Sequence, residues 1–268
     1  MSKVTDYYSS FDEWGRLDRE PLEFQINLQY IRKYLPPSGR ILDNGAGPGK
    51  YAIELAKLGY EITLSDMTPR LVEMAEQKAS ELGVLKQFNG FHVLNATQLE
   101  AILNEMYDAS LMLGPLYHLQ QEAERVSAVK ELYRVTKRNG IVFVAFQSRI
   151  RMSITSLQSP EHWKPHDSMD SIQAFYRSGI FDHNDKGRFT GAYYFQINEI
   201  KPFMESHGFE TLDLIGSSSF GTLLNSEQKQ YWTDKGEYEK LIEFLTAAAN
   251  DPAILGISSH LLYIGRKK

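Results

Sequence analysis

Short apolar runs alternate with helical stretches through the first half of the chain. The runs are expected to form strands at residues 40–43, 61–65, 91–94, 109–113 and 141–146. Strands that alternate with helices build a parallel sheet with helices on both faces. The run at 141–146 is apolar at every position, which is typical of a strand buried on both sides. The pattern therefore predicts a doubly wound α/β fold.

Helices are expected between these strands, at residues 51–58, 69–82, 98–104 and 122–136. Gly59 and Gly83 follow two of these stretches, and a glycine commonly ends a helix. Pro69 stands at the start of the stretch 69–82, where its missing N–H group costs nothing. Residues 40–146 are therefore expected to form one Rossmann-like core.

The flanking segments follow other patterns. Residues 1–39 carry an apolar helical face and are expected to form an N-terminal helical cap. Residues 147–195 mix prolines, glycines and aromatic side chains, which predicts a lid inserted after the fifth strand. Residues 196–268 are expected to complete the sheet with an antiparallel last strand and a helical insertion. In this last segment we expect helices at 198–206 and 226–249, strands at 209–215 and 259–264, and a solvated terminus at 265–268.

Composition narrows the classes of function. The 268 residues contain no cysteine, which excludes disulfide scaffolds, thiolate metal sites and a cysteine nucleophile. The 29 basic and 34 acidic residues give a net charge of −5, which disfavours a large nucleic-acid footprint. No stretch approaches the roughly 20 apolar residues that span a bilayer, and the chain does not start like a signal peptide. We therefore expect a cytoplasmic protein without a membrane partner.

A cluster of glycines, Gly45 to Gly49, lies between the first strand and the first helix of the core. Glycines at this position let the backbone approach a ligand closely, because a Cβ atom would clash with it. The phosphate-binding loop pattern needs a glycine where Asn44 stands and a hydroxyl group where Tyr51 stands. The dinucleotide fingerprint needs a glycine where Lys50 stands. Neither of these two nucleotide motifs is therefore complete.

The pattern that is present is Asp-x-Gly-x-Gly-x-Gly, formed by Asp43, Gly45, Gly47 and Gly49, and Asp66 follows at the end of the second strand. The run from residue 41 to 75 resembles the first two motifs of the class I S-adenosylmethionine-dependent methyltransferases. The resemblance covers residues 40–146. It implies S-adenosylmethionine as cofactor, the Rossmann-like fold and a methyl-transfer reaction.

The resemblance also implies roles for single residues. The backbone at Gly45, Ala46 and Gly47 would underlie the methionine and ribose part of the cofactor. Asp43 would orient the loop or meet the cofactor's ammonium group. Asp66 would accept hydrogen bonds from both ribose hydroxyls, since a carboxylate has two acceptor oxygens. The alternative for Asp66 is an N-cap of the helix that follows it.

The adenine side is carried by residues after the second and third strands. By resemblance, Met67 would lie along the adenine face, and Asn95 and Ala96 would contact the adenine edge. Asn95 stands where the family usually has an acidic residue, and it could instead form an Asx turn. Leu113 ends the fourth strand at the switch point of the sheet, where ligands bind in this topology.

The candidate for proton chemistry is His118, five residues beyond the fourth strand. Methyl transfer from a sulfonium is an in-line displacement, so the enzyme chiefly supplies proximity and excludes water. A base is useful where the acceptor must lose a proton, and the ordinary pKa of histidine suits that role at neutral pH. The alternative is that His118 packs against Tyr117.

The expected reaction is methyl transfer to an oxygen or nitrogen atom of a small organic acceptor. The segment after the fourth strand lacks the Asn-Pro-Pro-Tyr type of pattern that grips nucleic-acid bases in similar enzymes. We therefore expect no nucleic-acid partner, no metal, and a monomer or a homodimer. Three alternatives remain: an RNA or protein methyltransferase, a nicotinamide-dependent reductase, and a cofactor-binding regulatory protein. Tyr7, Tyr8 and Trp14 of the cap could cover the sulfonium or pack within the cap.

Overall fold

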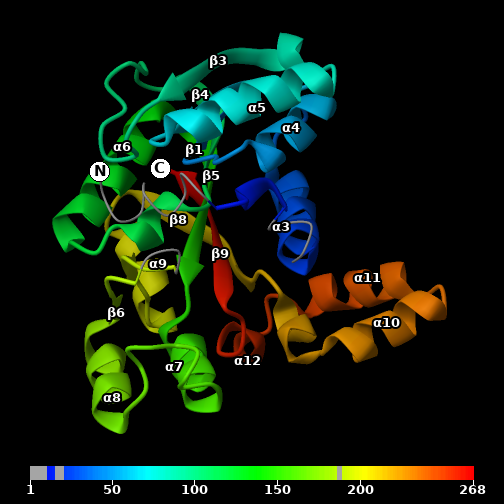
Figure 1. Cartoon of the computed structure of the whole chain (residues 1–268). Helices are drawn as coiled ribbons and strands as arrows, with labels where there is room; N and C mark the ends of the chain where they lie inside the picture. Colours follow the sequence, from blue (N-terminus) through cyan, green and yellow to red (C-terminus); the bar gives the residue numbers. More distant parts are fainter. Residues whose placement is uncertain (1–10, 16–20, 186–188) are drawn as a thin grey trace.

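The fold is built on one seven-stranded sheet (Figure 1), seen in a computed structural model that describes residues 11–15, 21–185 and 189–268. The order across the sheet is β3-β2-β1-β4-β5-β9-β8. The first five strands are parallel, and β9 runs antiparallel to both of its neighbours. The strands are β1 (Arg40–Asn44), β2 (Glu61–Asp66), β3 (Phe88–Val93), β4 (Tyr107–Met112), β5 (Thr136–Gln147), β8 (Phe209–Gly216) and β9 (His260–Lys267). The predicted doubly wound fold with an antiparallel last strand is confirmed.

Helices cover both faces of the sheet because the side chains of its central strands alternate between two cores. In β5, Ile141 and Phe143 belong to one core, whereas Val142 and Val144 belong to the other. The first core is covered by α3 (Pro21–Tyr34), α4 (Lys50–Lys57) and α5 (Pro69–Glu81). The second is covered by α6 (Glu122–Val135) and α9 (Ile197–Glu205). A strand segment with two buried faces is apolar at successive positions, as residues 141–146 of β5 are.

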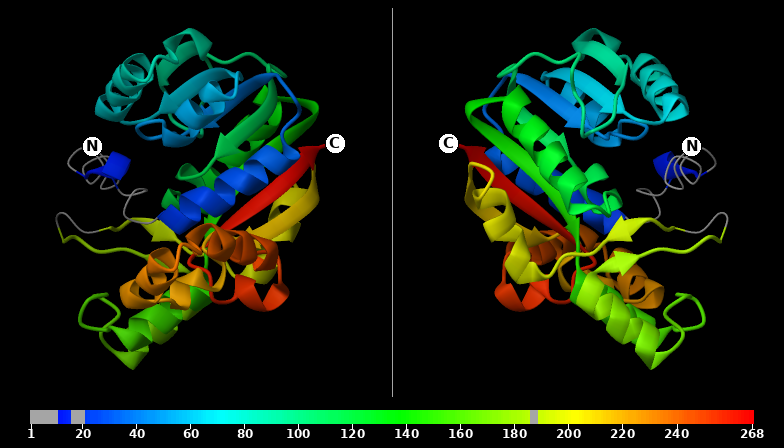
Figure 2. Two further views of the ribbon diagram at one scale, coloured as in Figure 1. Left: turned by 90° about the vertical axis from the view of Figure 1, so that its right-hand side faces the viewer. Right: turned by 90° about the vertical axis from the view of Figure 1, so that its left-hand side faces the viewer.

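Two insertions follow β5 in the chain, one between β5 and α9 and one between β8 and β9. The first contains α7 (Arg149–Gln158), α8 (Met169–Ser178), β6 (Ile180–Phe181) and β7 (Ala192–Tyr193). The second, between β8 and β9, contains the short helix η3 (Ser219–Leu223), α10 (Ser226–Asp234), α11 (Tyr238–Ala248) and α12 (Pro252–Leu255). Figure 2 shows the helices of both insertions at the opposite end of the molecule from β2 and β3.

Four local predictions were wrong, each for a physical reason. Residues 98–104 form turns instead of a helix, because side chains of α6 hold their backbone. The single helix expected at 226–249 is broken in two at Gly236, whose φ is +70°. The terminal tract 265–268 is not wholly solvated, since β9 runs to Lys267, which is 4% exposed. β3 begins three residues earlier than expected, at Phe88, after a short 3-10 helix η1 (Leu85–Gln87).

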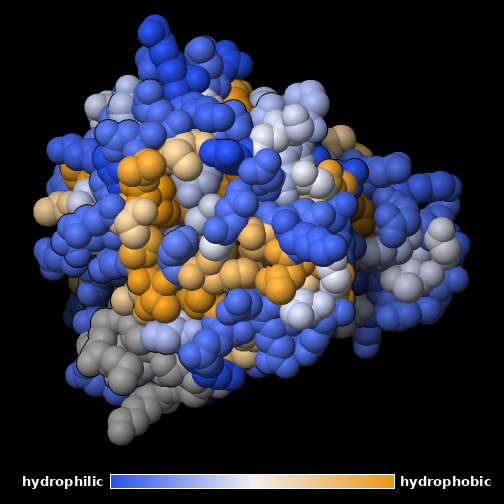
Figure 3. Space-filling model, turned by 90° about the horizontal axis from the view of Figure 1, so that it is seen from above, coloured by the Kyte–Doolittle hydropathy of each residue, from blue (hydrophilic) through white to orange (hydrophobic). Residues whose placement is uncertain are grey.

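The surface at the β3 end of the sheet is mixed in character. Figure 3 looks down on the molecule from the side of β3 and α5, and apolar atoms gather there among polar ones. Large apolar side chains exposed near this edge include Leu82, Leu85 and Val93. Among the residues that the structure describes, no helix is both long and apolar enough to cross a membrane.

Candidate active site

One cavity of about 430 Å³ opens at the carboxyl ends of the parallel strands. Its walls come from the loops after β1, β2, β3 and β4, which is where ligands bind in open α/β sheets. Every residue predicted to hold the cofactor lines this cavity, apart from Gly49, which is the N-cap of α4. The predicted proton acceptor, His118, lines it as well. The structure thus brings residues from four separate segments into one pocket.

The glycine loop has a backbone that side chains would disrupt. Gly45, Gly47 and Gly49 have φ angles of +73°, +56° and +81°, which L side chains rarely adopt. A Cβ atom on Gly45 would lie 2.1 Å from Cγ of Pro115, so the loop can contact the segment after β4 only with a glycine there. The N–H groups of Gly45 and Ala46 both donate to the carbonyl oxygen of Ser65, at 2.7 and 3.0 Å. The loop is therefore fixed against β2 as a smooth cradle.

Asp66 joins this loop to the end of β2. Its Oδ2 accepts from the N–H of Gly47 at 2.9 Å, and its Oδ1 accepts from the N–H of Thr68 at 2.8 Å. The N-cap of α5 is Thr68, so the N-cap alternative for Asp66 is wrong. Burial raises the pKa of the Asp66 carboxyl, and the two backbone donors oppose that shift. The Thr68 side chain is a third donor to this carboxylate. A carboxylate has about four acceptor positions, so acceptor capacity remains for a ligand hydroxyl.

Asp43 is a second acid in the same wall. It is 2% exposed, and burial raises its pKa to about 7, with the nearby charge of Asp66 adding to the effect. The backbone N–H of Ala52 donates to it and opposes the shift. Two buried carboxyl groups beside one cavity favour a ligand that brings positive charge, because a cation stabilises their ionised forms.

The next wall of the cavity is formed by residues that follow β2 and β3. Met67, Asn95 and Ala96 line the pocket there, and Met67 is 41% exposed. Asn95 Oδ1 accepts from the N–H of Thr97 at 3.0 Å, so the Asx turn considered for this residue is present. A contact of Asn95 or Ala96 with adenine stays a prediction.

The third wall is the segment after β4, which includes the short helix η2 (Pro115–His118). The Tyr117 hydroxyl donates to the carbonyl oxygen of Leu113 at 3.3 Å. The His118 ring lies 4.9 Å from the Tyr117 ring and 5.3 Å from the Phe189 ring, measured between centroids. His118 therefore both packs against Tyr117 and faces the cavity, and the two interpretations of this residue are compatible.

Sequence reasoning missed several residues that line the cavity from other segments. Glu23 of α3 is 7% exposed and lines the cavity, and its Oε2 lies 3.3 Å from Nδ1 of His260. The signal was an acid within the apolar stripe of a helix, since Glu23 stands three residues before Ile26. Asp182 and Gly191, in the connection between β6 and β7, also line the cavity. Neither carries a sequence signal for this position.

Of the three cap aromatics considered as a cover for the sulfonium, Trp14 is described. It packs against the first core, and the Nζ atoms of Lys50 in α4 and Lys78 in α5 each lie 5.5 Å from the centre of its indole. Both roles considered for Trp14 stay predictions. Tyr7 and Tyr8 lie outside the described residues.

Comparison with protein families matches residues 41–140 to the model of a methyltransferase domain. Three relatives differ in what their names say they act on. A candidate methyltransferase of Geobacillus sp. (strain WCH70) is 24% identical over 77% of this chain and 90% of its own length. A ubiquinone biosynthesis O-methyltransferase of Xanthomonas axonopodis is 29% identical, over 50% of this chain and 57% of its own. A tRNA 5-carboxymethoxyuridine methyltransferase of Escherichia coli is 21% identical, over 93% and 88%.

Solved structures share the fold. A S-adenosylmethionine-dependent methyltransferase of Methanosarcina mazei aligns with a TM-score of 0.58 at 20% identity, over 89% of this chain and 96% of that one. A chain of the complex between the Haloferax volcanii Trm112 methyltransferase activator and a candidate methyltransferase aligns with a TM-score of 0.64 at 15% identity, over 100% and 99%. At these identities the structures support the architecture alone.

Proposed function

We propose that this chain, which is a class I S-adenosylmethionine-dependent methyltransferase, transfers the cofactor's methyl group to an oxygen or nitrogen atom of a small organic acceptor. The observation that carries the proposal is the continuity of one cavity from the glycine loop to the wall around His118. Reaction by direct displacement needs both substrates in one enclosed space, with the reacting atoms aligned.

The residues present fit S-adenosylmethionine, which supplies a methyl group already activated by a positive sulfur. A glycine at position 45 lets the loop lie against Pro115, where a Cβ atom would clash, and both residues line the cavity. Asp66 would hold the ribose hydroxyls with its remaining lone pairs, and Asp43 would face the ammonium group. Met67 and Ala96 would lie along the adenine ring.

The chain's own contribution to the chemistry is placement, exclusion of water and removal of a proton. His118 lines the cavity from the wall that follows β4, and imidazole is the side chain whose ordinary pKa suits it to accept a proton near neutral pH. For an acceptor hydroxyl, His118 would take the proton as the oxygen attacks the methyl carbon and S-adenosylhomocysteine leaves as a neutral thioether. An acceptor ammonium would first lose its proton to His118, because only the free amine has the lone pair that attacks. The connection between β6 and β7 contributes Asp182 and Gly191 to the lining of the pocket.

The charge of the pocket favours a small neutral or cationic acceptor. Apart from Asp43 and Asp66, its described lining carries four carboxylates and one lysine, namely Glu13, Glu23, Glu124, Asp182 and Lys50. A polyanionic backbone entering this space would be repelled. We place the acceptor between the segment 113–121 and the lid, residues 147–195, and the reaction in the cytoplasm.

The test begins with the cofactor and then turns to the acceptor. Isothermal titration calorimetry should show binding of S-adenosylmethionine and S-adenosylhomocysteine, with no competition by NADH. Transfer of radiolabelled methyl should then follow in a panel of small phenols, catechols and amines. Transfer to none of these compounds, with label entering bulk tRNA instead, would overturn the small-molecule acceptor while leaving the cofactor assignment intact.

RNA is the second candidate because the tRNA methyltransferase relative aligns with 93% of this chain. The two candidates differ in their response to salt. Binding to tRNA releases counterions and weakens steeply as salt rises, whereas binding of a small uncharged acceptor does not. A gel-shift titration with tRNA at two salt concentrations therefore separates them.

A further inference from the structure

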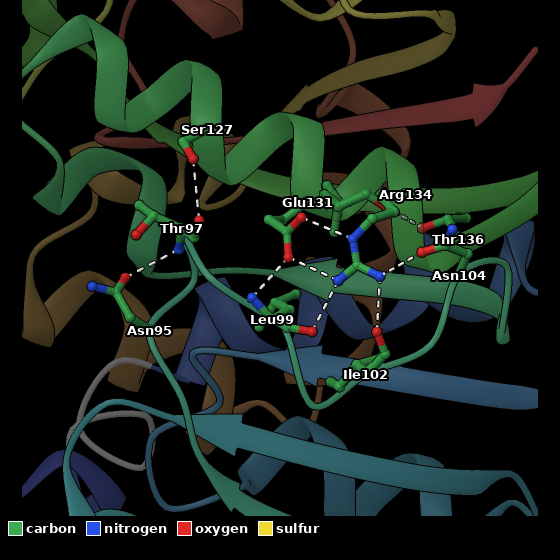
Figure 4. Close-up of polar contacts among 10 residues, drawn as sticks. Asn95, Thr97, Leu99, Ile102, Asn104, Ser127, Glu131, Arg134 and Thr136 are labelled. Carbon is green, nitrogen blue, oxygen red and sulfur yellow. Dashed lines mark hydrogen bonds and ion pairs between the residues drawn. The ribbon is translucent and has the colours of Figure 1, made fainter.

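Helix α6 stands between two walls of the pocket and contacts each of them through a different face. Ser127, Glu131 and Arg134 are spaced by four and three residues, so they share one face of the helix. Arg125 stands two residues before Ser127, which places it on nearly the opposite side. Figure 4 shows the first face, turned toward the loop that follows β3.

Arg134 uses all five of its N–H donors on this loop and on Glu131. Its Nη2 donates to the carbonyl oxygen of Leu99 at 2.9 Å and to Glu131 Oε2 at 2.8 Å. Its Nη1 donates to the carbonyl oxygen of Ile102 at 2.8 Å and to Asn104 Oδ1 at 2.7 Å. Its Nε donates to Glu131 Oε1 at 2.8 Å. A planar guanidinium can satisfy this set of acceptors, and an ammonium cannot.

The same face continues to the wall of the pocket. Glu131 Oε2 accepts from the N–H of Leu99 at 2.7 Å, and Ser127 Oγ donates to the carbonyl oxygen of Thr97 at 3.1 Å. Thr97 in turn donates its N–H to the side chain of Asn95, which lines the cavity. Residues 95–104 have no regular secondary structure, so these contacts replace the ladder that would otherwise fix a strand or helix.

Arg125 does the corresponding work on the other wall. It is 6% exposed, and its Nη1 donates to the carbonyl oxygens of Leu119 and Gln120 at 2.8 and 2.7 Å. Its guanidinium lies 3.7 Å from the ring centre of Tyr193 in β7, and the Tyr193 hydroxyl accepts from Arg149 Nη2 at 3.0 Å. Leu119 and Gln120 directly follow His118 and line the cavity. Arg125 thus ties the wall that carries His118 to the lid.

We propose that Arg134 and Arg125 are positioning residues with separate effects: Arg134, together with Glu131, sets the affinity for the cofactor, whereas Arg125 orders the wall of residues 113–121 without setting that affinity. The assignment of this second wall to the acceptor rests on the proposed function. Neither arginine lines the cavity, so each acts through backbone carbonyls that it holds.

The separation is tested without any acceptor, so its failure is distinct from a failure of the proposed small-molecule reaction. Calorimetry with S-adenosylhomocysteine should give Arg134→Gln a dissociation constant raised about tenfold, because several charge-assisted bonds to the loop are lost. Arg134→Lys should recover part of this loss, and Ser127→Ala should raise the constant two- to threefold. Arg125→Gln should leave it within twofold of the unmodified chain.

Hydrogen exchange followed by mass spectrometry supplies the local readout. Arg134→Gln should speed exchange in residues 95–104 and leave 114–121 unchanged, and Arg125→Gln should do the reverse. Lys130→Gln is the matched control, since Lys130 is an exposed cation on the same helix. Equal loss of cofactor affinity in both arginine variants would overturn the separation. An Arg134→Gln affinity equal to that of Lys130→Gln would overturn the positioning role, and Ser127→Ala decides the question where Arg134→Gln does not fold.

Discussion

The two halves of the pocket are built by different means. The half proposed to hold the cofactor is built from local segments: the glycine loop after β1 donates backbone N–H groups to Ser65 and Asp66, and the acids Asp43 and Asp66 stand at the ends of adjacent strands. The acceptor half consists of side chains from segments far apart in the sequence, including Glu23, His118 and Asp182. A site formed by segments that are close in the sequence can be recognised from a short stretch of residues. A site made of distant side chains depends on the whole fold.

This difference has a functional consequence. A cradle formed by glycine backbone tolerates few substitutions, so its shape stays constant and suits the part of the site that holds a fixed cofactor. Side chains on inserted segments can change without disturbing the sheet, so they suit the part that selects an acceptor. The relatives agree with this division, since their names share methyl transfer and differ in the acceptor.

The largest effect should come from closing the cradle. Gly45→Ala puts a Cβ atom against Pro115 and forces alanine into a φ of +73°, so S-adenosylhomocysteine affinity should fall at least about 1000-fold. Gly59→Ala is the control, because Gly59 has a φ of +93° and open space where the Cβ would lie. Calorimetry should show full affinity in the control variant. Equal losses in both would mean that backbone strain, and no steric cradle, explains the effect.

A pH effect should follow from the buried acid of the cofactor half. The Asp43 pKa is raised to about 7 from its ordinary value of 3.8, so the native state holds this proton more tightly than the unfolded chain. The contribution to stability is present below about pH 4 and is lost as pH rises toward 7, at most about 4 kcal/mol.

The measurement is the melting temperature of the ligand-free protein as a function of pH. Asp43→Asn cannot ionise, so the difference between the variant and the unmodified chain should widen between pH 4 and 7. Asp108→Asn is a useful contrast. Desolvation raises the Asp108 pKa, but the hydrogen bonds from Lys137 and from the N–H of Arg40, together with the charge of Lys137, outweigh it and leave that pKa lowered. Parallel curves for Asp43→Asn and the unmodified chain would contradict the raised pKa.

A substitution at His118, in the proposed acceptor half, should lower kcat without changing the affinity for the cofactor. His118→Gln keeps a polar side chain and removes the proton acceptor, so kcat should fall about 100-fold for an acceptor that must lose a proton. The dissociation constant of S-adenosylhomocysteine should stay within twofold. A fall in cofactor affinity as large as the fall in kcat would show that the two halves are not separate at this residue.

The smallest effect should come from Asp66, which joins the glycine loop to the end of β2. Asp66→Ala removes the acceptors of the Gly47 and Thr68 N–H groups together with the proposed ribose contacts, and cofactor affinity should fall about tenfold or more. Asp66→Asn keeps one acceptor oxygen and should lose less. The comparison of S-adenosylhomocysteine with S-adenosylmethionine for both variants checks that the loss lies in the shared ribose.

The sequence predicted the cofactor half because each of its signals is local. Glycine spacing and the acid at the end of β2 report backbone geometry within one βαβ unit. The turns at 98–104 were mistaken for a helix because their fixing groups, Glu131 and Arg134, lie thirty residues downstream. Glu23 and His260 meet across the whole chain, and no short window of sequence contains both.

The position of β9 bears on how the molecule is made. Among the described strands, β8 pairs with β9 alone, and β9 lies between β5 and β8. A ribosome synthesises β8 well before β9, so during translation β8 has no strand to pair with and β5 keeps an open edge. The parallel half of the sheet can form first. Its completion waits for residues 260–267, and the nascent chain should therefore be most prone to aggregation in that interval.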